Sequence, residues 1–218
     1  MNRLWTGVLD LLFPPKCVFC GQLLEDGARD LCPACCRALP WLTGAQAEQA
    51  PEWLDLAASP LRYEGRVRDS FHRYKFGGMQ SYAGAYAALM ARCVEEHFPG
   101  RYDLITWAPL SRRRRRERGY DQAELLARAL SRRLGVPAQA LLVKTRHTAA
   151  QSGLEEAAAR RANARDAYRC PHPERAAGRR LLLVDDIITS GATSSECARI
   201  LRQNGAKAVF CATLARAR

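Results

Sequence analysis

The sequence predicts an α/β fold with a mostly parallel sheet and a small cysteine-rich unit near its N-terminus. Three observations lead to this prediction. Short apolar runs alternate with segments of helical periodicity, two Cys-x-x-Cys pairs stand close together, and 218 residues can bury one sizeable core plus an appendage. We expect residues 1–40 to form an amphipathic helix and the cysteine unit, 41–60 a connector, and 61–218 the α/β domain.

The cysteine unit is expected to bind zinc. Two Cys-x-x-Cys pairs lie eleven residues apart, a spacing that suits the tetrahedral geometry of a structural zinc site. The expected ligands are Cys17, Cys20, Cys32 and Cys35. Cys36 is an alternative to Cys35, although the spacing favours Cys35, and the competing interpretation is a set of reduced thiols or a redox pair. Four thiolates leave no open coordination position, so this zinc would stabilise the fold and take no part in catalysis.

The segment before these cysteines, Met1–Pro15, has the apolar spacing of a short amphipathic helix and lacks the charged start and cleavage site of a signal peptide. Reduced thiols without a leader predict a cytoplasmic protein, and no apolar stretch is long enough to span a bilayer. The scattered cysteines are expected in the core as small apolar residues; they are Cys93, Cys170, Cys197 and Cys211.

The α/β domain follows from the alternation of strand and helix patterns. Helices are expected to end at glycine or proline, as at Gly77-Gly78, Pro99-Gly100 and Gly135. The expected strands are 61–65, 103–107, 140–143, 181–184 and 206–214, and the expected helices are 67–76, 81–98, 121–134, 155–163 and 194–203. Strands that alternate with helices pair in parallel through right-handed crossovers.

The segment that begins at Leu181 carries the strongest functional signal. An apolar run typical of a buried parallel strand ends in Asp185 and Asp186. In open α/β sheets the ligand lies beyond the carboxyl ends of the strands, where these acids would emerge. The small-residue turn that follows can close around a phosphate at the start of the next helix; it consists of Thr189, Ser190, Gly191, Ala192 and Thr193. The segment therefore predicts a site for a phosphorylated ribose, and the alternative is a turn that only caps the helix.

A second loop is expected at the same edge of the sheet, after the strand at 103–107. It contains Ser111 and five consecutive arginines, and it ends at Arg118. Arg118 is our preferred ligand for an anionic leaving group such as pyrophosphate, because arginine binds phosphate oxygens in bidentate fashion. The alternative is a solvated basic helix.

A third loop follows the strand at 140–143. Its short polar residues and arginines suit a hood that closes over a bound phosphate ester and excludes water. The candidate hood residues are Arg146, Gln151 and Arg160. The alternative is an ordinary exposed connection, and His147 is expected to be a surface residue.

The charge balance favours an anionic partner. The formal net charge is +12, and all but four of the 34 basic residues are arginines. Pyrophosphate is one such partner. Single-stranded nucleic acid is another, with Trp107 or Tyr120 as a stacking surface.

Taken in order, these motifs resemble the ComF family of competence-associated proteins, which are similar to type I phosphoribosyltransferases. The resemblance rests on Phe13-Pro14-Pro15 with the four cysteines, Tyr63-Glu64-Gly65, Lys75-Phe76-Gly77-Gly78, Pro109-Leu110-Ser111, Arg118-Gly119-Tyr120-Asp121-Gln122, Thr148-x-x-Gln151, Arg160-x-x-Asn163 and Val184-Asp185-Asp186 to Thr193. The family usually has Asn where this chain has Asp121, and an extra carboxylate here is expected to repel a pyrophosphate.

The resemblance implies a role in natural transformation, on or beside incoming single-stranded DNA and with other competence proteins. It implies that Asp185 and Asp186 hold the ribose hydroxyls of phosphoribosyl pyrophosphate (PRPP), that the loop from Thr189 to Thr193 holds its 5′-phosphate, and that magnesium binds with it. Two functions follow. One is pentosyl transfer from PRPP to an acceptor that the sequence does not identify; the other is a non-catalytic nucleic-acid-binding or adaptor module that keeps the phosphate loop.

Overall fold

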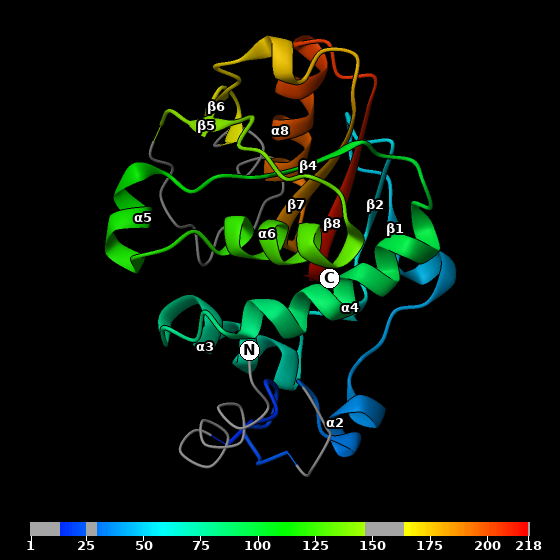
Figure 1. Ribbon diagram of the computed structural model, residues 1–218, viewed down its shortest axis with the longest axis vertical. Helices are drawn as coiled ribbons and strands as arrows, with labels where there is room; N and C mark the ends of the chain where they lie inside the picture. Colours follow the sequence, from blue (N-terminus) through cyan, green and yellow to red (C-terminus); the bar gives the residue numbers. More distant parts are fainter. Residues whose placement is uncertain (1–13, 25–29, 147–163, 218) are drawn as a thin grey trace.

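The computed structural model describes residues 14–24, 30–146 and 164–217, and its main sheet has six strands in these ranges (Figure 1). The strand order is β1-β2-β8-β7-β4, and β3 also pairs with β8. All pairs are parallel except β1 with β2. The strands are β1 (Glu48–Gln49), β2 (Leu56–Ala58), β3 (Leu61–Arg62), β4 (Leu104–Trp107), β7 (Arg180–Ile188) and β8 (Ala208–Arg216). The predicted mostly parallel sheet is confirmed.

Helices cover both faces of this sheet. One face packs against α4 (Tyr82–His97) and α6 (Gln122–Leu134), and the other against α8 (Ala192–Gln203) (Figure 1). Helix α3 (Gly65–Phe76) belongs to the same core as α4 and α6. The central strand β7 shows why both faces need a cover. Leu182 and Val184 belong to the first core, Leu181 and Leu183 belong to the second, and all four are fully buried.

Two segments differ from the sequence expectations. The connector expected at 41–60 contains β1 and β2, which extend the main sheet beyond β8. The strand expected at 140–143 is instead β5 (Val143–Lys144), which pairs antiparallel with β6 (Tyr168–Arg169) in a separate two-stranded sheet. Leu141 and Leu142, which precede β5, are buried in the core but belong to no strand. Their burial alone therefore explains the apolar pattern that predicted a strand.

The boundaries around the acidic pair also differ. β7 continues through Asp185 and Asp186 to Ile188, because its parallel ladder with β8 runs as far as the pair Ile188 and Arg216. α8 begins at Ala192, two residues earlier than expected. The acids thus stand on the rigid end of a strand and the loop between strand and helix is short.

The cysteine unit packs against α3, on the side of the helix layer away from the sheet (Figure 1). Cys32 caps the N-terminus of α2 (Pro33–Ala38), and its sulfur accepts a hydrogen bond from the Cys35 backbone N–H. On α3, the Ser70 hydroxyl donates to the carbonyl of Val18, and the Arg73 guanidinium donates to the carbonyls of Val18 and Phe19. Side chains of α3 thereby hold the backbone of the first cysteine turn.

The four scattered cysteines, Cys93, Cys170, Cys197 and Cys211, are all buried, as predicted. The predicted helix at 155–163, and all but the last two residues of the predicted helix at 1–15, lie outside the described residues. None of the helices within the described ranges combines the length and apolar character needed to cross a membrane.

Candidate functional site

The ends of two neighbouring strands bring the expected site residues to one edge of the sheet. Trp107, the last residue of β4, pairs with Val184 of β7, and the Ala108 N–H donates to the Val184 carbonyl. The loop after β4 therefore starts directly beside Asp185. Since the phosphate loop follows β7, both loops leave the sheet at its carboxyl edge.

Asp185 and Asp186 differ in their surroundings. The Asp186 carboxylate forms an ion pair with Lys75, with 2.7 Å between Nζ and Oδ2, and both side chains are about four-fifths buried. Burial, followed by the negative charge of Asp186, raises the pKa of Asp185 from its ordinary value of 3.8 to about 8. Burial and the neighbouring acid therefore favour the protonated form of Asp185, while Lys75 forms its ion pair with Asp186.

Lys75 is a site residue that the sequence indicates only as part of a family motif. It belongs to the last turn of α3, and its ammonium also lies 4.6 Å from the ring centroid of Phe71. The contact with Asp186 joins residues more than a hundred positions apart, which no local pattern reveals. A signal was present, because Lys75 is one of only four lysines and stands just before Gly77-Gly78.

Replacing Asp185 with asparagine is expected to stabilise the protein at alkaline pH. Because its pKa is raised in the folded state, the folded protein keeps a proton that the unfolded chain loses, so stability falls as pH rises from about 4 to about 8. Between pH 5 and pH 9 the advantage of Asp185→Asn should grow by about 2 kcal/mol or more in urea unfolding. Parallel pH profiles for variant and parent would contradict the raised pKa.

The predicted phosphate loop is compact and begins α8 without a side-chain cap. Gly191 is the N-cap residue, with φ of +74°, and Ser194 donates its hydroxyl back to the Gly191 carbonyl. Within the described residues, the Ser190 hydroxyl is screened from solvent and has no hydrogen-bond partner. No side chain of the turn caps α8, so capping does not explain its residues. The buried Ser190 hydroxyl is left as a hydrogen-bond donor for a ligand.

Thr189 faces a separate small cavity. The cavity measures about 330 Å³, and its lining includes Gln49 and the arginines Arg62 and Arg216. Thr189 is thus turned toward basic side chains beside the loop, at the end of β8.

Arg118 lies where the sequence predicts it, close to the acidic pair. Burial lowers its pKa, an effect that the charge of Asp186 opposes. Its guanidinium lies 5.0 Å from the ring centroid of Phe76 and donates to Oε1 of Gln122 at 3.0 Å. The Gln122 Nε2 is itself buried without a partner in the described residues. The ammonium of Lys75, the guanidinium of Arg118 and the unpaired amide of Gln122 therefore border the carboxyl edge of β7.

Asp121, the residue expected to repel a pyrophosphate, has a structural role in the fold. It is the N-cap of α6, is 4% exposed, and accepts hydrogen bonds from the backbone N–H groups of Leu110, Ala123 and Glu124. Burial raises its pKa. Its carboxylate thus fastens the loop after β4 to α6, because one oxygen accepts from Leu110 and the other accepts from the first turn of the helix.

The expected stacking surface on Trp107 or Tyr120 is wrong. Trp107 is 5% and Tyr120 8% exposed, and the Tyr120 hydroxyl donates to the carbonyl of Tyr74. Among the described residues, the exposed large aromatic side chains are Trp53 and Phe76, at 44% and 62%. Neither carried a sequence signal that distinguished it from a core residue.

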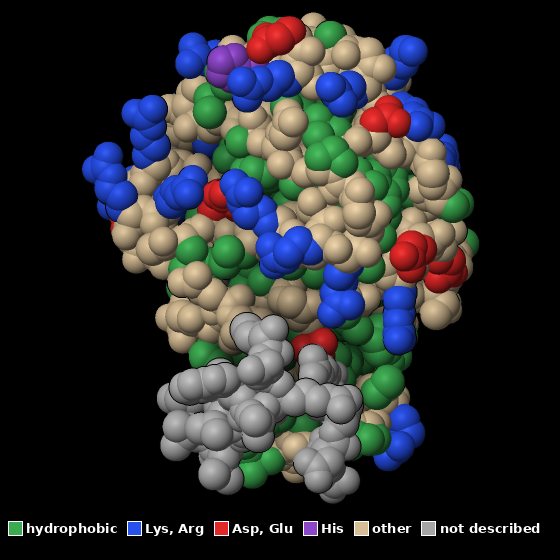
Figure 2. Space-filling model, in the orientation of Figure 1, with side chains coloured by type: hydrophobic (Ala, Val, Ile, Leu, Met, Phe, Trp, Pro, Cys, Tyr) green, Lys and Arg blue, Asp and Glu red, His purple; other side chains and the backbone are tan. Residues whose placement is uncertain are grey.

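The arginine run forms α5 (Arg112–Arg118), and Ser111 caps this helix by accepting from the Arg114 N–H. Lys and Arg side chains gather at the left of the face seen in Figure 2, where Figure 1 places α5. Arg113 pairs with Glu117 and Arg115 with Glu124. Part of this basic surface is thus balanced by neighbouring acids.

Of the predicted hood, only the start is described. Arg146 follows β5 and donates to the backbone carbonyl of Arg165. Burial lowers the pKa of the neighbouring Lys144. His147, Gln151 and Arg160 lie outside the described residues.

The four predicted zinc ligands come together as expected. The sulfur atoms of Cys17, Cys20, Cys32 and Cys35 all lie within 4.8 Å of one another. A tetrahedral site with Zn–S bonds of about 2.3 Å places sulfurs about 3.8 Å apart, and Cys20 and Cys32 are at 3.7 Å. Cys36 is exposed and outside the cluster. Arg66 of α3 donates to the Cys35 sulfur at 3.4 Å and offsets part of the thiolate charge.

Comparison with protein families matches both parts of the chain. Residues 121–218 match the phosphoribosyl transferase domain, and residues 8–47 match the double zinc ribbon domain. Together with the four-cysteine cluster, the second match identifies the N-terminal unit as a structural zinc ribbon. The first match agrees with the parallel sheet and identifies the larger unit as a phosphoribosyltransferase-type domain.

Several curated proteins are similar over nearly the whole chain. DNA utilization protein YhgH of Escherichia coli (strain K12) is 31% identical, over 94% of this chain and 100% of its own length. Competence protein F of Haemophilus influenzae is 32% identical, over 93% of this chain and 85% of its own. Competence protein ComFC of Bacillus subtilis is 26% identical, over 90% and 82%.

Among solved structures, a glutamine PRPP amidotransferase from B. subtilis, complexed with ADP and GMP, is 20% identical with a TM-score of 0.44. The match covers 64% of this chain and 30% of that one.

Proposed function

This chain belongs to the family of the DNA utilization protein YhgH and the competence proteins F and ComFC, and on that premise we propose that it binds a ribose 5-phosphate ester such as PRPP. The binding site is the edge formed by Asp185, Asp186 and the loop that begins α8. The single observation that carries the proposal is the buried hydroxyl of Ser190, which has no partner in the described residues and stands in the loop expected to hold the phosphate.

The phosphate would bind at the start of α8. Backbone N–H groups at a helix N-terminus and the helix dipole favour an anion there. Gly191 adopts the left-handed conformation that makes the turn tight, and Ser190 supplies a hydroxyl donor. Since the loop is short and one end is a paired strand, the phosphate is held with little reorganisation.

The ribose hydroxyls would bind at the acidic pair. Asp186 accepts from them as a carboxylate, while Asp185, whose pKa is raised to about 8, can also donate a proton in a hydrogen bond. As positive charge develops at C1′ when pyrophosphate leaves, the negative charge of Asp186 stabilises it. Lys75 and Arg118, the cations around Asp186, would bind the pyrophosphate oxygens.

Magnesium fits this donor set. It prefers oxygen ligands and is commonly bound by one or two carboxylates together with substrate phosphates. Asp185 and Asp186 would supply those carboxylate oxygens, and the ion would neutralise charge on the leaving pyrophosphate.

The biological role that fits the named relatives is the handling of incoming single-stranded DNA during natural transformation, in the cytoplasm and beside other competence proteins. Exposed arginines of α5 support contact with nucleic acid. The alternative function is a non-catalytic nucleic-acid-binding or adaptor module that keeps the phosphate loop. Release of pyrophosphate from PRPP separates the transferase from this alternative.

The proposal is tested by calorimetry with ribose 5-phosphate and with PRPP plus Mg²⁺. Asp186→Asn is expected to weaken PRPP binding ten- to a hundredfold, since a hydrogen bond to a charged group contributes about 1.5–3 kcal/mol. Asp103→Asn is the matched control, because Asp103 lies at the opposite end of β4, where it pairs with Arg180. No binding by the parent protein, or equal losses in the two variants, would contradict the proposed site.

A further inference from the structure

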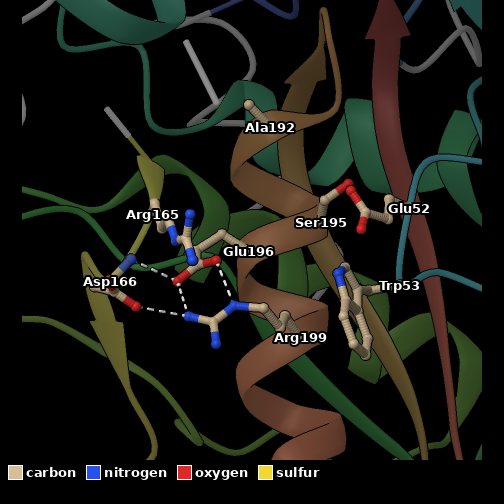
Figure 3. A pocket seen from close by; sticks show the side chains of 8 residues that line it. All are labelled: Glu52, Trp53, Arg165, Asp166, Ala192, Ser195, Glu196 and Arg199. Atoms are coloured by element: carbon tan, nitrogen blue, oxygen red, sulfur yellow. Dashed lines mark hydrogen bonds and ion pairs between the residues drawn. The ribbon is translucent and has the colours of Figure 1, made fainter. Parts of the chain in front are cut away.

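A cavity of about 510 Å³ runs along α8 from its first residue, Ala192. Its other lining residues on the helix are Ser195, Glu196 and Arg199, which share one face of α8. In Figure 3 one wall consists of Glu52 and Trp53 and the opposite wall of Arg165 and Asp166, with strands of the main sheet behind the helix. The cavity thus begins at the phosphate loop and leads away from it along the helix.

The walls of this cavity contain unusual backbone conformations. Trp53 has φ of +69° and Asp166 has φ of +56°, in the left-handed region that non-glycine residues rarely adopt. For a bulky aromatic residue this conformation is unfavourable, and such strain is concentrated at ligand-binding sites. Trp53 is nevertheless 44% exposed, so the strained backbone presents an indole to the cavity and does not bury it.

The polar groups of the cavity are held rigidly. Glu196 is 7% exposed, and its carboxylate accepts hydrogen bonds from the Asp166 N–H at 2.7 Å and from the Arg199 guanidinium at 2.7 and 2.8 Å. Arg199 also donates to Asp166. Across the helix, the side chains of Ser195 and Glu52 point toward one another beside the indole (Figure 3). A flat ring wall with fixed carboxylates nearby suits a nucleobase, which stacks on the ring and donates its amino group to an acidic oxygen.

The wall that carries Trp53 is tied to the phosphate loop. Pro51 packs so closely on Gly191 that a Cβ at position 191 would lie 2.9 Å from the proline Cβ. A base stacked on Trp53 would therefore belong to a nucleoside on the α8 side of a phosphate in the loop. The sugar held by the acidic pair would lie on the β7 side of the same phosphate. A phosphate with a nucleoside on each side is a phosphodiester.

We propose that this cavity binds the penultimate nucleoside of a single-stranded nucleic acid whose 3′-terminal nucleotide occupies the ribose phosphate site. This inference rests on the proposed function of Asp185, Asp186 and the phosphate loop. The terminal nucleotide of a strand offers a free 3′-hydroxyl to the acidic pair and a 5′-phosphodiester to the loop. An internal nucleotide has no free 3′-hydroxyl, so the site selects strand ends.

The test compares a short oligodeoxyadenylate that ends in a free 3′-hydroxyl with the same strand ending in a 3′-phosphate, by fluorescence anisotropy. The free end should bind at least about tenfold more tightly. Trp53→Ala should weaken binding of the free-ended strand by roughly five- to a hundredfold, because stacking of one base on an aromatic side chain contributes about 1–3 kcal/mol. Trp53→Phe should retain most of the affinity, and ribose 5-phosphate should bind both variants as it binds the parent.

The possible failures are distinguishable. Unchanged oligonucleotide binding in Trp53→Ala, or an equal loss for ribose 5-phosphate, overturns the cavity assignment. Equal binding of strands with a 3′-hydroxyl and a 3′-phosphate overturns the selection of strand ends. If ribose 5-phosphate binds but no oligonucleotide does, the proposed function stands and this inference falls. If the oligonucleotide binds through Trp53 but ribose 5-phosphate does not bind, the ribose phosphate site is wrong and the base cavity stands.

Discussion

Replacing Cys35 with serine is expected to remove zinc from the ribbon and to lower the stability of the protein severely. The sulfur of Cys35 is fully buried among the other three thiolates, and structural zinc contributes about 10–16 kcal/mol of binding free energy in isolated ribbon-sized peptides. A loss of roughly 3 kcal/mol or more would lower the melting temperature by about 6–12 °C for a chain of this size. Elemental analysis and thermal unfolding measure the two effects.

The neighbouring Cys36 provides the matched control. It differs from Cys35 by one position, yet it is exposed and outside the cluster. Cys36→Ser should therefore keep both the zinc and the melting temperature of the parent. Full zinc content in Cys35→Ser, or loss of zinc in Cys36→Ser, would show that the four-cysteine cluster is not the metal site.

Replacing Gly191 with alanine is expected to cost about 2–5 kcal/mol and to abolish binding of ribose 5-phosphate. The left-handed backbone costs a non-glycine residue about 1–2 kcal/mol. The added Cβ would also stand 2.9 Å from that of Pro51, and such overpacking typically costs about 1–3 kcal/mol. Relief of this contact would move the phosphate loop, so the ligand loses its binding geometry as well.

Gly135 is the control that separates the cost of the left-handed backbone from the cost of the contact with Pro51. It has nearly the same φ, +67°, but a Cβ there would meet nothing within 4 Å. Gly135→Ala should therefore cost about 1–2 kcal/mol and leave ligand binding unchanged. Urea unfolding and calorimetry on both variants make the comparison, and equal effects at the two glycines would show that contact with Pro51 does not shape the loop.

The parts of the fold that could be predicted are those with a strong local signal. The apolar run before Asp185 predicts a central strand because that strand is buried on both faces, and two close Cys-x-x-Cys pairs predict a metal site without knowledge of the fold. β1 and β2 are two and three residues long, and Leu56-Ala57-Ala58 is too short and too rich in alanine for a recognisable strand pattern. Their pairing depends on β8, more than 140 residues away.

Within the candidate site, the missed features are also nonlocal. Lys75 meets Asp186 across more than a hundred positions of sequence, and Trp53 lines a cavity that is also lined by residues of α8. Asp121 is a further example. Its charge predicts repulsion of a ligand, and the fold adds a second role, because both carboxylate oxygens accept backbone hydrogen bonds. Charge alone does not indicate function until the partners of the group are known.

Helix α3 has one further consequence, for the modularity of the chain. Near its start Arg66 contacts a zinc ligand, in its middle Ser70 and Arg73 hold the backbone of the ribbon, and at its end Lys75 pairs with Asp186. A rigid helix thus belongs to the ribbon and to the sheet edge at the same time. The ribbon is therefore not a detachable accessory: α3 lies between the two family-defined domains in the sequence and contacts both, so they should unfold as one cooperative unit.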